Sequence, residues 1–211
     1  MNQKSILIQL RSSIFFLLVI FALAPKTASS EEKQGEQIYQ QCITCHGKQG
    51  QGNTDLKSPQ LAGQHDWYLT RQLHNFKTGI RGNHQKDFFG QQMIPLAQVL
   101  SEHDTKLIAR YLSSLESETN KPSQVDQKNG YRYYQAKCGA CHGGRAEGNA
   151  AFNAPKIASQ NIDYLMRQMT NFKNGVRGNH PSDKLGKQMA MMSKIVSDKE
   201  LEDILNYVTQ L

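Results

Sequence analysis

The feature that most constrains this chain is an internal repeat marked by all four of its cysteines. The cysteines lie in two short segments, 42–46 and 138–142, and both segments read C-x-x-C-H. An offset of 96 residues aligns the two segments and the residues that follow them without a gap. In this alignment 29 of the 74 residues in 42–115 are identical to their counterparts. Repetition at a fixed period indicates repeated structural units. The sequence therefore predicts two copies of one small domain.

The pattern C-x-x-C-H is typical of covalent haem c attachment. Both thiols form thioethers to the haem vinyl groups, and the adjacent histidine ligates the iron. A zinc or redox site could also use a C-x-x-C pair, but two copies that use every cysteine and continue into His-Gly favour haem. Two haem c groups are therefore predicted, with no cysteine left for a disulfide. The predicted attachment residues are Cys42, Cys45, Cys138 and Cys141, and the predicted proximal ligands are His46 and His142.

Residues 1–30 have the three-part pattern of a secretory signal peptide. Basic residues precede an apolar run at 14–24, and small residues follow it. An uncleaved membrane anchor is the alternative, but the run holds 11 residues, whereas a spanning helix needs roughly 20. We expect cleavage just before Glu31 and a mature protein in the periplasm.

The repeat divides the mature chain into an N-terminal domain at 31–115 and a C-terminal domain at 130–211. Between them, residues 116–129 are polar and contain Pro122, which is typical of a linker. Strand patterns are weak throughout, and the apolar residues of both domains recur at helical spacing. The predicted fold class is all-α.

Each domain is expected to contain at least three helices. The first begins near Glu36 or Gly130. The middle helix has an apolar stripe spaced four, three and four residues apart, and the last helix opens with a capping box. The stripes are Leu69, Leu73, Phe76 and Ile80, and Leu165, Met169, Phe172 and Val176; the boxes begin at Ser101 and Ser197.

The sixth iron ligand decides the chemistry of each haem. Methionine opposite histidine raises the potential and blocks other ligands, whereas an open position admits O₂ or peroxide. Met93 is the sole methionine between the first haem motif and the linker, and Met189 lies at the matching position of the second copy. His84 and His180 compete with them, in a repeated R-G-N-H that also reads as a polar loop. We favour methionine.

Other repeated residues are candidates for the haem surroundings. Arg81 and Arg177 carry guanidinium forks that suit haem propionates. Pro59 and Pro155 follow the haem histidines by 13 residues, where a carbonyl could accept the imidazole Nδ1–H and fix the ring; loop shaping is their alternative role. Met191 and Met192 are expected to line the haem pocket or the interdomain surface.

Together these motifs resemble the dihaem cytochrome c4 family over essentially the whole mature chain. The shared features are C-x-x-C-H-G, P-Q-L-A-G-Q at 59–64, Y-L-x-R-Q at 68–72, the methionine before S-E-x-D, and the tandem second copy. The resemblance implies two tandem class I cytochrome c domains, related by a pseudo-twofold axis, with the haems near the domain interface. It implies His46, Met93, His142 and Met189 as iron ligands. The chain departs from the family in its duplicated R-G-N-H and in Ser159, where the first copy has Gly63.

The resemblance also implies a periplasmic electron carrier, often membrane-associated, that delivers electrons towards a terminal oxidase. We therefore favour electron transfer without catalysis, from a donor such as a quinol-oxidising complex. An electron-accepting subunit of a dehydrogenase complex is the alternative. A dihaem peroxidase is disfavoured, because it needs an open iron position and both copies keep a methionine.

The charge of the chain bears on its partners. A formal charge of +7 first suggests nucleic acid or a membrane. Three of the basic residues lie in the predicted signal peptide, however, so the mature chain has 22 basic and 18 acidic residues. Because no basic recognition motif is present, we expect no nucleic-acid partner; peripheral membrane association stays open.

Overall fold

The computed structural model describes residues 30–118 and 127–211; the predicted signal peptide up to residue 29 and most of the predicted linker lie outside these residues. Within them the chain forms helices and two isolated β-bridges, which confirms the all-α prediction. The N-terminal half contains α1 (Ser30–Tyr39), α2 (Ile43–His46), α3 (Asp66–Lys77), α4 (Phe88–Gln98) and α5 (Glu102–Ser114). The C-terminal half contains α6 (Gln127–Lys137), α7 (Gly139–His142), the 3₁₀-helix η1 (Ala150–Phe152), α8 (Ile162–Lys173), α9 (Lys184–Lys194) and α10 (Asp198–Val208).

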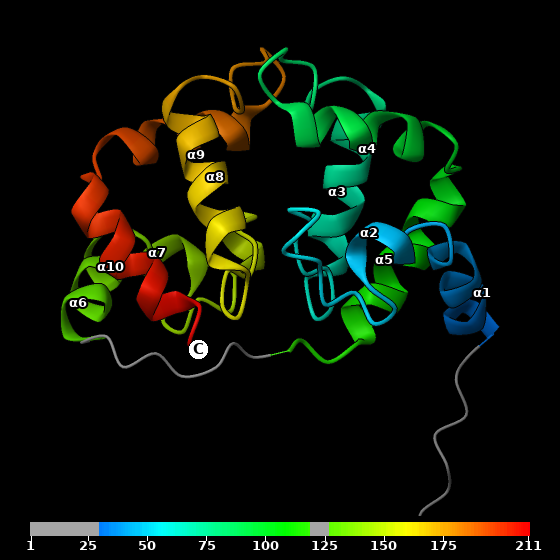
Figure 1. Ribbon diagram of the computed structural model, residues 1–211, viewed down its shortest axis with the longest axis horizontal. Coiled ribbons are helices and arrows are strands. Elements are labelled where there is room, and N and C mark those ends of the chain that lie inside the picture. The colour runs from blue at the N-terminus through cyan, green and yellow to red at the C-terminus, as the bar shows by residue number, and fades with distance from the viewer. Residues whose placement is uncertain (1–29, 119–126) are drawn as a thin grey trace, which may run out of the picture.

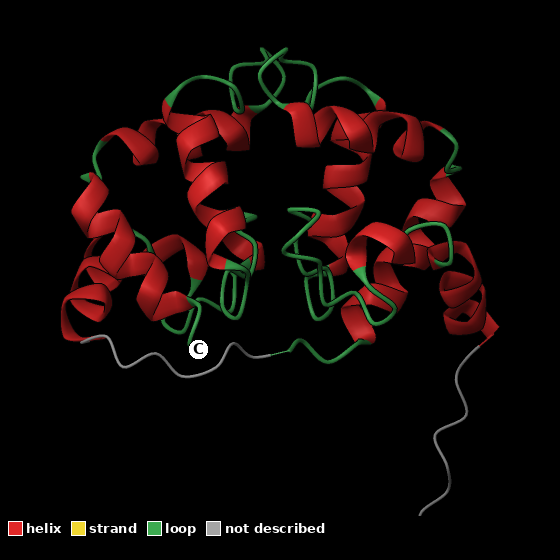
Figure 2. Cartoon of the chain, viewed as in Figure 1, coloured by secondary structure: helices red, strands yellow, loops and turns green. Residues whose placement is uncertain are grey.

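The two halves lie side by side and repeat the same order of α-helices (Figures 1 and 2). In Figure 1, α3 and α8 flank the centre of the molecule, and the loops that follow them meet at the top. Each half is therefore one structural copy of the sequence repeat.

The first and last helices of each half cross at a glycine. A Cβ atom on Gly35 of α1 would lie 2.7 Å from the Cβ of Tyr111 in α5, and one on Gly130 of α6 would lie 2.7 Å from that of Tyr207 in α10. Carbon atoms cannot approach this closely, so only glycine allows these two pairs of helices to pack in contact. The crossing fixes the helix that leads into each haem motif.

Each half buries a small apolar core. In the N-terminal half the clustered buried residues are Tyr39, Leu69, Ile108, Ala109 and Leu112. A core of this size stabilises a domain of about 80 residues poorly by itself. A further apolar group at the centre of each half would supply what the side chains lack.

The predicted capping boxes are present in both halves. The Ser101 hydroxyl accepts a hydrogen bond from the Asp104 amide at 3.0 Å, and the Ser197 hydroxyl accepts one from the Glu200 amide at 3.3 Å. Each acid in turn accepts from the backbone amide of its serine, at 3.1 and 2.9 Å. Both boxes start the last helix where the sequence places it.

Other helix boundaries differ from the prediction. Helices α1 and α6 begin six and three residues earlier than expected. The middle helices end before Ile80 and Val176, because Gly79 and Gly175 adopt left-handed φ angles of 72° and 69°. The last member of each predicted apolar stripe therefore lies in a turn outside the helix, where Val176 is buried and Ile80 is half-buried.

Helices α4 and α9 have no counterpart in the sequence prediction. The α4 segment contains Gly90 and Pro95, which are poor helix formers. Its helical state therefore depends on tertiary contacts, chiefly with α3.

Candidate haem sites

Each C-x-x-C-H motif forms one helical turn. The His46 amide donates to the Cys42 carbonyl, and the His142 amide donates to the Cys138 carbonyl, both at 2.9 Å. Positions i, i+3 and i+4 lie on one face of a helix. The two sulfur atoms and the imidazole of each motif therefore share one face, which a flat ring attached through two thioethers requires.

Both haem histidines are buried and oriented by a proline carbonyl. Nδ1 of His46 lies 3.0 Å from the Pro59 oxygen, and Nδ1 of His142 lies 2.8 Å from the Pro155 oxygen. Donation by Nδ1–H leaves Nε2 unprotonated and free to ligate a metal. Burial also lowers the pKa of both imidazoles, which favours the neutral ring. The hydrogen bonds through which these prolines would orient the haem histidines are therefore present.

The cysteines are unpaired and available for haem attachment. Burial raises the pKa of the Cys42 and Cys138 thiols to about 11. Thiolate is the reactive form of cysteine, so these buried thiols resist oxidation to a disulfide.

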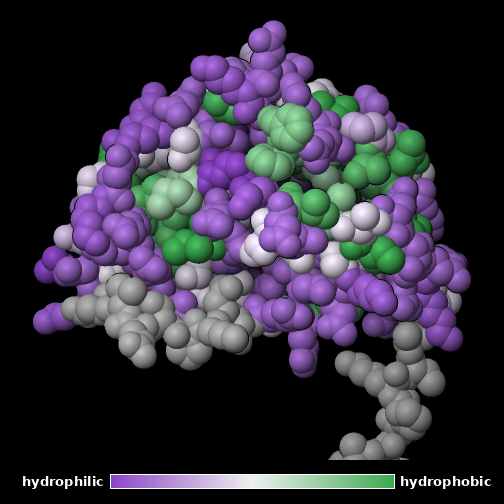
Figure 3. Space-filling model, in the orientation of Figure 1, coloured by the Kyte–Doolittle hydropathy of each residue, from purple (hydrophilic) through white to green (hydrophobic). Residues whose placement is uncertain are grey.

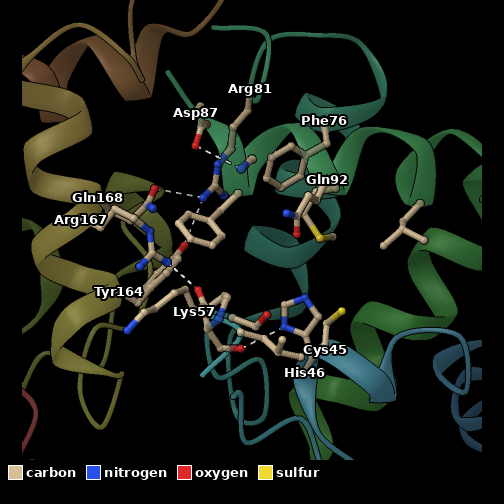
Figure 4. A pocket seen from close by; sticks show the side chains of 17 residues that line it. Cys45, His46, Lys57, Phe76, Arg81, Asp87, Gln92, Tyr164, Arg167 and Gln168 are labelled. Atoms are coloured by element: carbon tan, nitrogen blue, oxygen red, sulfur yellow. Dashed lines mark hydrogen bonds between the residues drawn. The ribbon is translucent and has the colours of Figure 1, made fainter. Parts of the chain in front are cut away.

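His46 lines a hollow of about 540 Å³ that is open to solvent. Figure 4 shows the imidazole on one side of it and the side chains of Phe76 and Gln92 on the other. Met93 lines the same hollow, so both predicted ligands of the first iron border one space.

Met93 and Met189 hold equivalent places in α4 and α9. Each helix begins at an aspartate that accepts a hydrogen bond from the amide three residues later, at 3.1 Å for Asp87 and 2.8 Å for Asp183. Both methionines are half-buried. Met191, by contrast, is 64% exposed and lies on the opposite side of α9 from Met189, so the expectation that it lines the haem pocket or the interdomain surface is wrong.

The competing histidines lie elsewhere. His84 and His180 line a separate hollow between the loops that follow α3 and α8, and neither borders the hollow of His46. Nδ1 of each ring accepts from the amide two residues later, at 3.1 and 3.2 Å. The repeated R-G-N-H is therefore a turn at the meeting of the two halves.

Arg81 connects the first haem site to the other half of the molecule. It is buried, and its guanidinium donates to Gln72 of its own half at 2.7 Å. It also donates to Tyr164 and Gln168 of the C-terminal half, at 3.2 and 3.1 Å (Figure 4). The sequence singled out this arginine but not its partners, although the repeated Y-L-x-R-Q already marked them.

Arg177 makes the same contacts in the opposite direction. It donates to Gln168 of its own half at 2.7 Å, and to Gln72 and Tyr68 across the boundary at 3.0 and 3.4 Å. Equivalent residues thus exchange equivalent bonds, which is what a pseudo-twofold relation between the halves produces.

The residues around the first hollow fit a haem that carries propionates. Arg81 lines the hollow, and its Nε–H is a buried donor without a partner in the described residues. A buried unpaired donor is costly, and a carboxylate acceptor would satisfy it. Its role toward a propionate, like that of Arg177, stays a prediction.

Reciprocal contacts with the main chain add to the interface. The Gln64 side chain bonds to the amide and carbonyl of Lys156, at 3.1 and 2.8 Å. The Gln160 side chain bonds in the same way to Gln60, at 2.9 Å in both bonds. Each amide side chain thus bonds to both the N–H and the C=O of one residue in the other half, as a neighbouring β-strand would. The two pairs of bonds fix how the halves are aligned with each other.

Comparison with known proteins gives the same architecture. The cytochrome c family model matches residues 32–116 and again 127–211. Cytochrome c-552 of Acidithiobacillus ferridurans is 26% identical over 99% of this chain and 91% of its own length. Cytochrome c4 of Stutzerimonas stutzeri is 26% identical over 94% of this chain and 97% of its own length.

Two further relatives bear on structure and function. The crystal structure of reduced recombinant cytochrome c4 from Pseudomonas stutzeri has a TM-score of 0.70 and 26% identity, and it covers 85% of this chain and 98% of that one. A thiosulfate dehydrogenase electron acceptor from Stutzerimonas stutzeri is 26% identical over 92% of this chain and 94% of its own length.

Proposed function

The chain belongs to the cytochrome c family and is similar to cytochrome c4, and on this premise we propose that it is a periplasmic carrier between respiratory-chain partners. It carries two haem c groups and transfers electrons. A donor such as a quinol-oxidising complex and an acceptor such as a terminal oxidase are the proposed partners. No helix in the described ranges is long and apolar enough to cross a membrane.

The observation that supports a carrier is the shared hollow of His46 and Met93. When bound, haem c supplies an iron that accepts and releases one electron. We assign His46 and Met93 as the axial ligands of the first site, and His142 and Met189 as those of the second. Two protein ligands leave no position for a substrate, so this set favours a carrier over a peroxidase.

The proline carbonyls and the buried arginines have positioning roles in this proposal. Pro59 and Pro155 hold the imidazoles with Nε2 directed away from the carbonyl. Arg81 and Arg177 hold the halves together and offer positive charge beside each site. The two sites therefore keep a fixed separation while electrons pass.

A second candidate follows from one of the relatives. The similarity to a thiosulfate dehydrogenase electron acceptor favours an acceptor that receives electrons from a dehydrogenase of sulfur compounds. The two candidates share the same haem sites and differ in the donor alone.

A redox titration of the full-length holoprotein, followed optically, tests the proposal. We expect two one-electron steps, and in the oxidised protein the long-wavelength absorption band of methionine-ligated ferric haem. Added cyanide should leave the spectrum of the reduced protein unchanged, because no iron position is open. A cyanide-induced change in one haem would favour a peroxidase. Rates of reduction by a quinol-oxidising complex and by a thiosulfate dehydrogenase would then separate the two donors.

A further inference from the structure

Helix α9 presents one continuous exposed face. Its exposed positions follow one another at helical spacing, so they form a single stripe along the helix. We call this stripe the α9 face; it consists of Lys184, Lys187, Gln188, Met191, Lys194 and Ile195, the last lying at the C-cap. Met191 is 64% and Ile195 is 58% exposed, so two large apolar side chains lie one helical turn apart on this face.

Helix α4 exposes the equivalent positions but with different chemistry. Its stripe is Phe88, Gln91, Gln92, Pro95, Gln98 and Val99. None of these side chains is charged, whereas the α9 face has three lysines and no acid. Two faces that are equivalent in the repeat have therefore diverged in charge while both kept exposed apolar residues.

The three lysines of the α9 face are not neutralised. The ion pairs of the described residues involve other side chains. The nearest acids along the chain are Asp183, which is buried and occupied as the N-cap of α9, and Asp198, which is paired with Lys173 at 2.7 Å. Lys137 contacts the carbonyl of Ile195 but is paired with Glu200 at 2.7 Å. The positive charge at this surface thus comes from Lys184, Lys187 and Lys194.

The charge difference extends over the two halves. Residues 130–211 hold 11 basic and 7 acidic residues, and residues 31–115 hold 9 and 8. In the view of Figure 3, hydrophobic surface gathers over the N-terminal half, on the right, and the upper part of the C-terminal half is mainly hydrophilic.

The α9 face lies beside a predicted haem site. On α4, Gln92 belongs to the exposed stripe and also lines the hollow that holds His46 and Met93. Gln188 is its repeat equivalent on α9, next to Met189. The α9 face meets the second haem site at its Gln188 edge, while Met191 lies on the opposite side of the helix from Met189, so a protein that covers the face comes within about the width of one helix of that site.

We infer that the α9 face is the docking site for an acidic redox protein. This inference rests on the proposed function and adds the chemistry of one partner to it. Met191 and Ile195 supply apolar contact, and the surrounding lysines steer a negatively charged surface into place. The uncharged α4 stripe lacks this steering, so the two halves receive different partners. Redox encounters are small and transient, which suits a face of one helix.

Binding of poly-L-glutamate to the full-length holoprotein, measured by calorimetry at low and high salt, tests the inference. The test variant is K184Q/K187Q/K194Q, and the matched control is K33Q/K48Q/K106Q, which removes the same charge from exposed positions of the N-terminal half. We expect the test variant to lose about tenfold or more in affinity at low salt and the control to lose less than about threefold. High salt should abolish the difference.

Three outcomes would overturn the inference. Equal losses in both variants would mean that net charge alone decides binding. No loss in the test variant would exclude the α9 face. Binding of anionic lipid vesicles through these lysines, without binding of poly-L-glutamate, would assign the face to a membrane. A redox titration of each variant keeps the proposed function separate, because exposed lysines can be replaced without changing either haem ligand.

Discussion

The guanidinium of Arg81 in the N-terminal half donates a hydrogen bond to the hydroxyl of Tyr164 in the C-terminal half, with Nη2 and Oη 3.2 Å apart. Burial alone would raise the pKa of Tyr164, but the charges of Arg81 and Arg177 outweigh it and lower the pKa. The bond joins α8 to the loop after α3, and both residues line the first hollow. One contact thus belongs both to the interface and to a haem site.

Replacing Arg81 with methionine should destabilise the protein strongly. The change removes three side-chain hydrogen bonds and leaves the amide oxygens of Gln72 and Gln168 without this donor. We expect the free energy of unfolding of the holoprotein to fall by about 2–4 kcal/mol in urea denaturation. Arg71→Met is the control, because Arg71 makes a single interdomain bond, to Asn153. Equal losses for both variants would contradict the central role of Arg81.

Adding a methyl group at the second helix crossing should also be costly. A Cβ on Gly130 would clash with Tyr207 of α10, whereas one on Gly144 would meet nothing within 4 Å. Gly130→Ala should lower the free energy of unfolding by about 1–3 kcal/mol, and Gly144→Ala should leave it nearly unchanged. Thermal melts of the two variants compare them directly; a normal melt for Gly130→Ala would show that the crossing can relax.

The carboxylate of Glu200 should make part of the stability depend on acid pH. A hydrogen bond from Lys137, followed by those from Ser197, lowers the pKa of Glu200 from about 4.5 to about 2. The folded pKa is below the unfolded one, so the stabilisation is fully present above about pH 4.5 and is lost as the pH falls toward 2. Glu200→Gln should therefore flatten the pH dependence of stability between these values. Glu102→Gln, at an exposed carboxylate in the first turn of α5, serves as the control and should not.

Loss of covalent haem should unfold the half that loses it. The buried cluster of the N-terminal half is small, and the hollow beside His46 would be left without its apolar occupant. We expect Cys42→Ala/Cys45→Ala to lose about half of the helical far-UV circular dichroism signal. Native helix content in this apoprotein half would falsify the dependence on haem.

The methionine ligands can be separated by substitution. Met93→Ala and Met189→Ala should each open one iron to cyanide and remove about half of the long-wavelength absorption band. Met191→Ala is the matched control, because this side chain is exposed on the opposite side of α9 from Met189. If Met93→Ala kept the full band, the sixth ligand of the first iron would be a residue other than Met93, and His84 would be the next candidate.

Local sequence patterns predicted the elements that are stabilised by contacts between residues close together in the sequence. The capping boxes at Ser101 and Ser197 form as expected, because the hydroxyl, the acid and the amides that they bond are within four residues. The turn at Gly79 shows the limit of such patterns. The spacing of Ile80 predicts that it belongs to the middle helix, but α3 ends before it because Gly79 adopts a left-handed φ.

Helices α4 and α9 show why the site was only partly predictable. The methionines could be located by counting along the repeat, but helix α4, which carries Met93, could not, because Gly90 and Pro95 oppose helix formation locally. Packing against α3 and the N-cap of Asp87 outweigh that local preference. Secondary structure stabilised by distant residues is not visible in a local window.

The sequence by itself determined the number of domains and the helical class, and it predicted the attachment cysteines and the candidate ligands. These follow from covalent chemistry that requires fixed spacing and from a repeat that preserves it. Only the tertiary structure decided that Arg81 and Arg177 exchange partners across the boundary, that His84 and His180 lie apart from the first haem hollow, and that Met191 faces solvent. Such contacts join residues about a hundred positions apart, and no spacing along the chain encodes the distance between them.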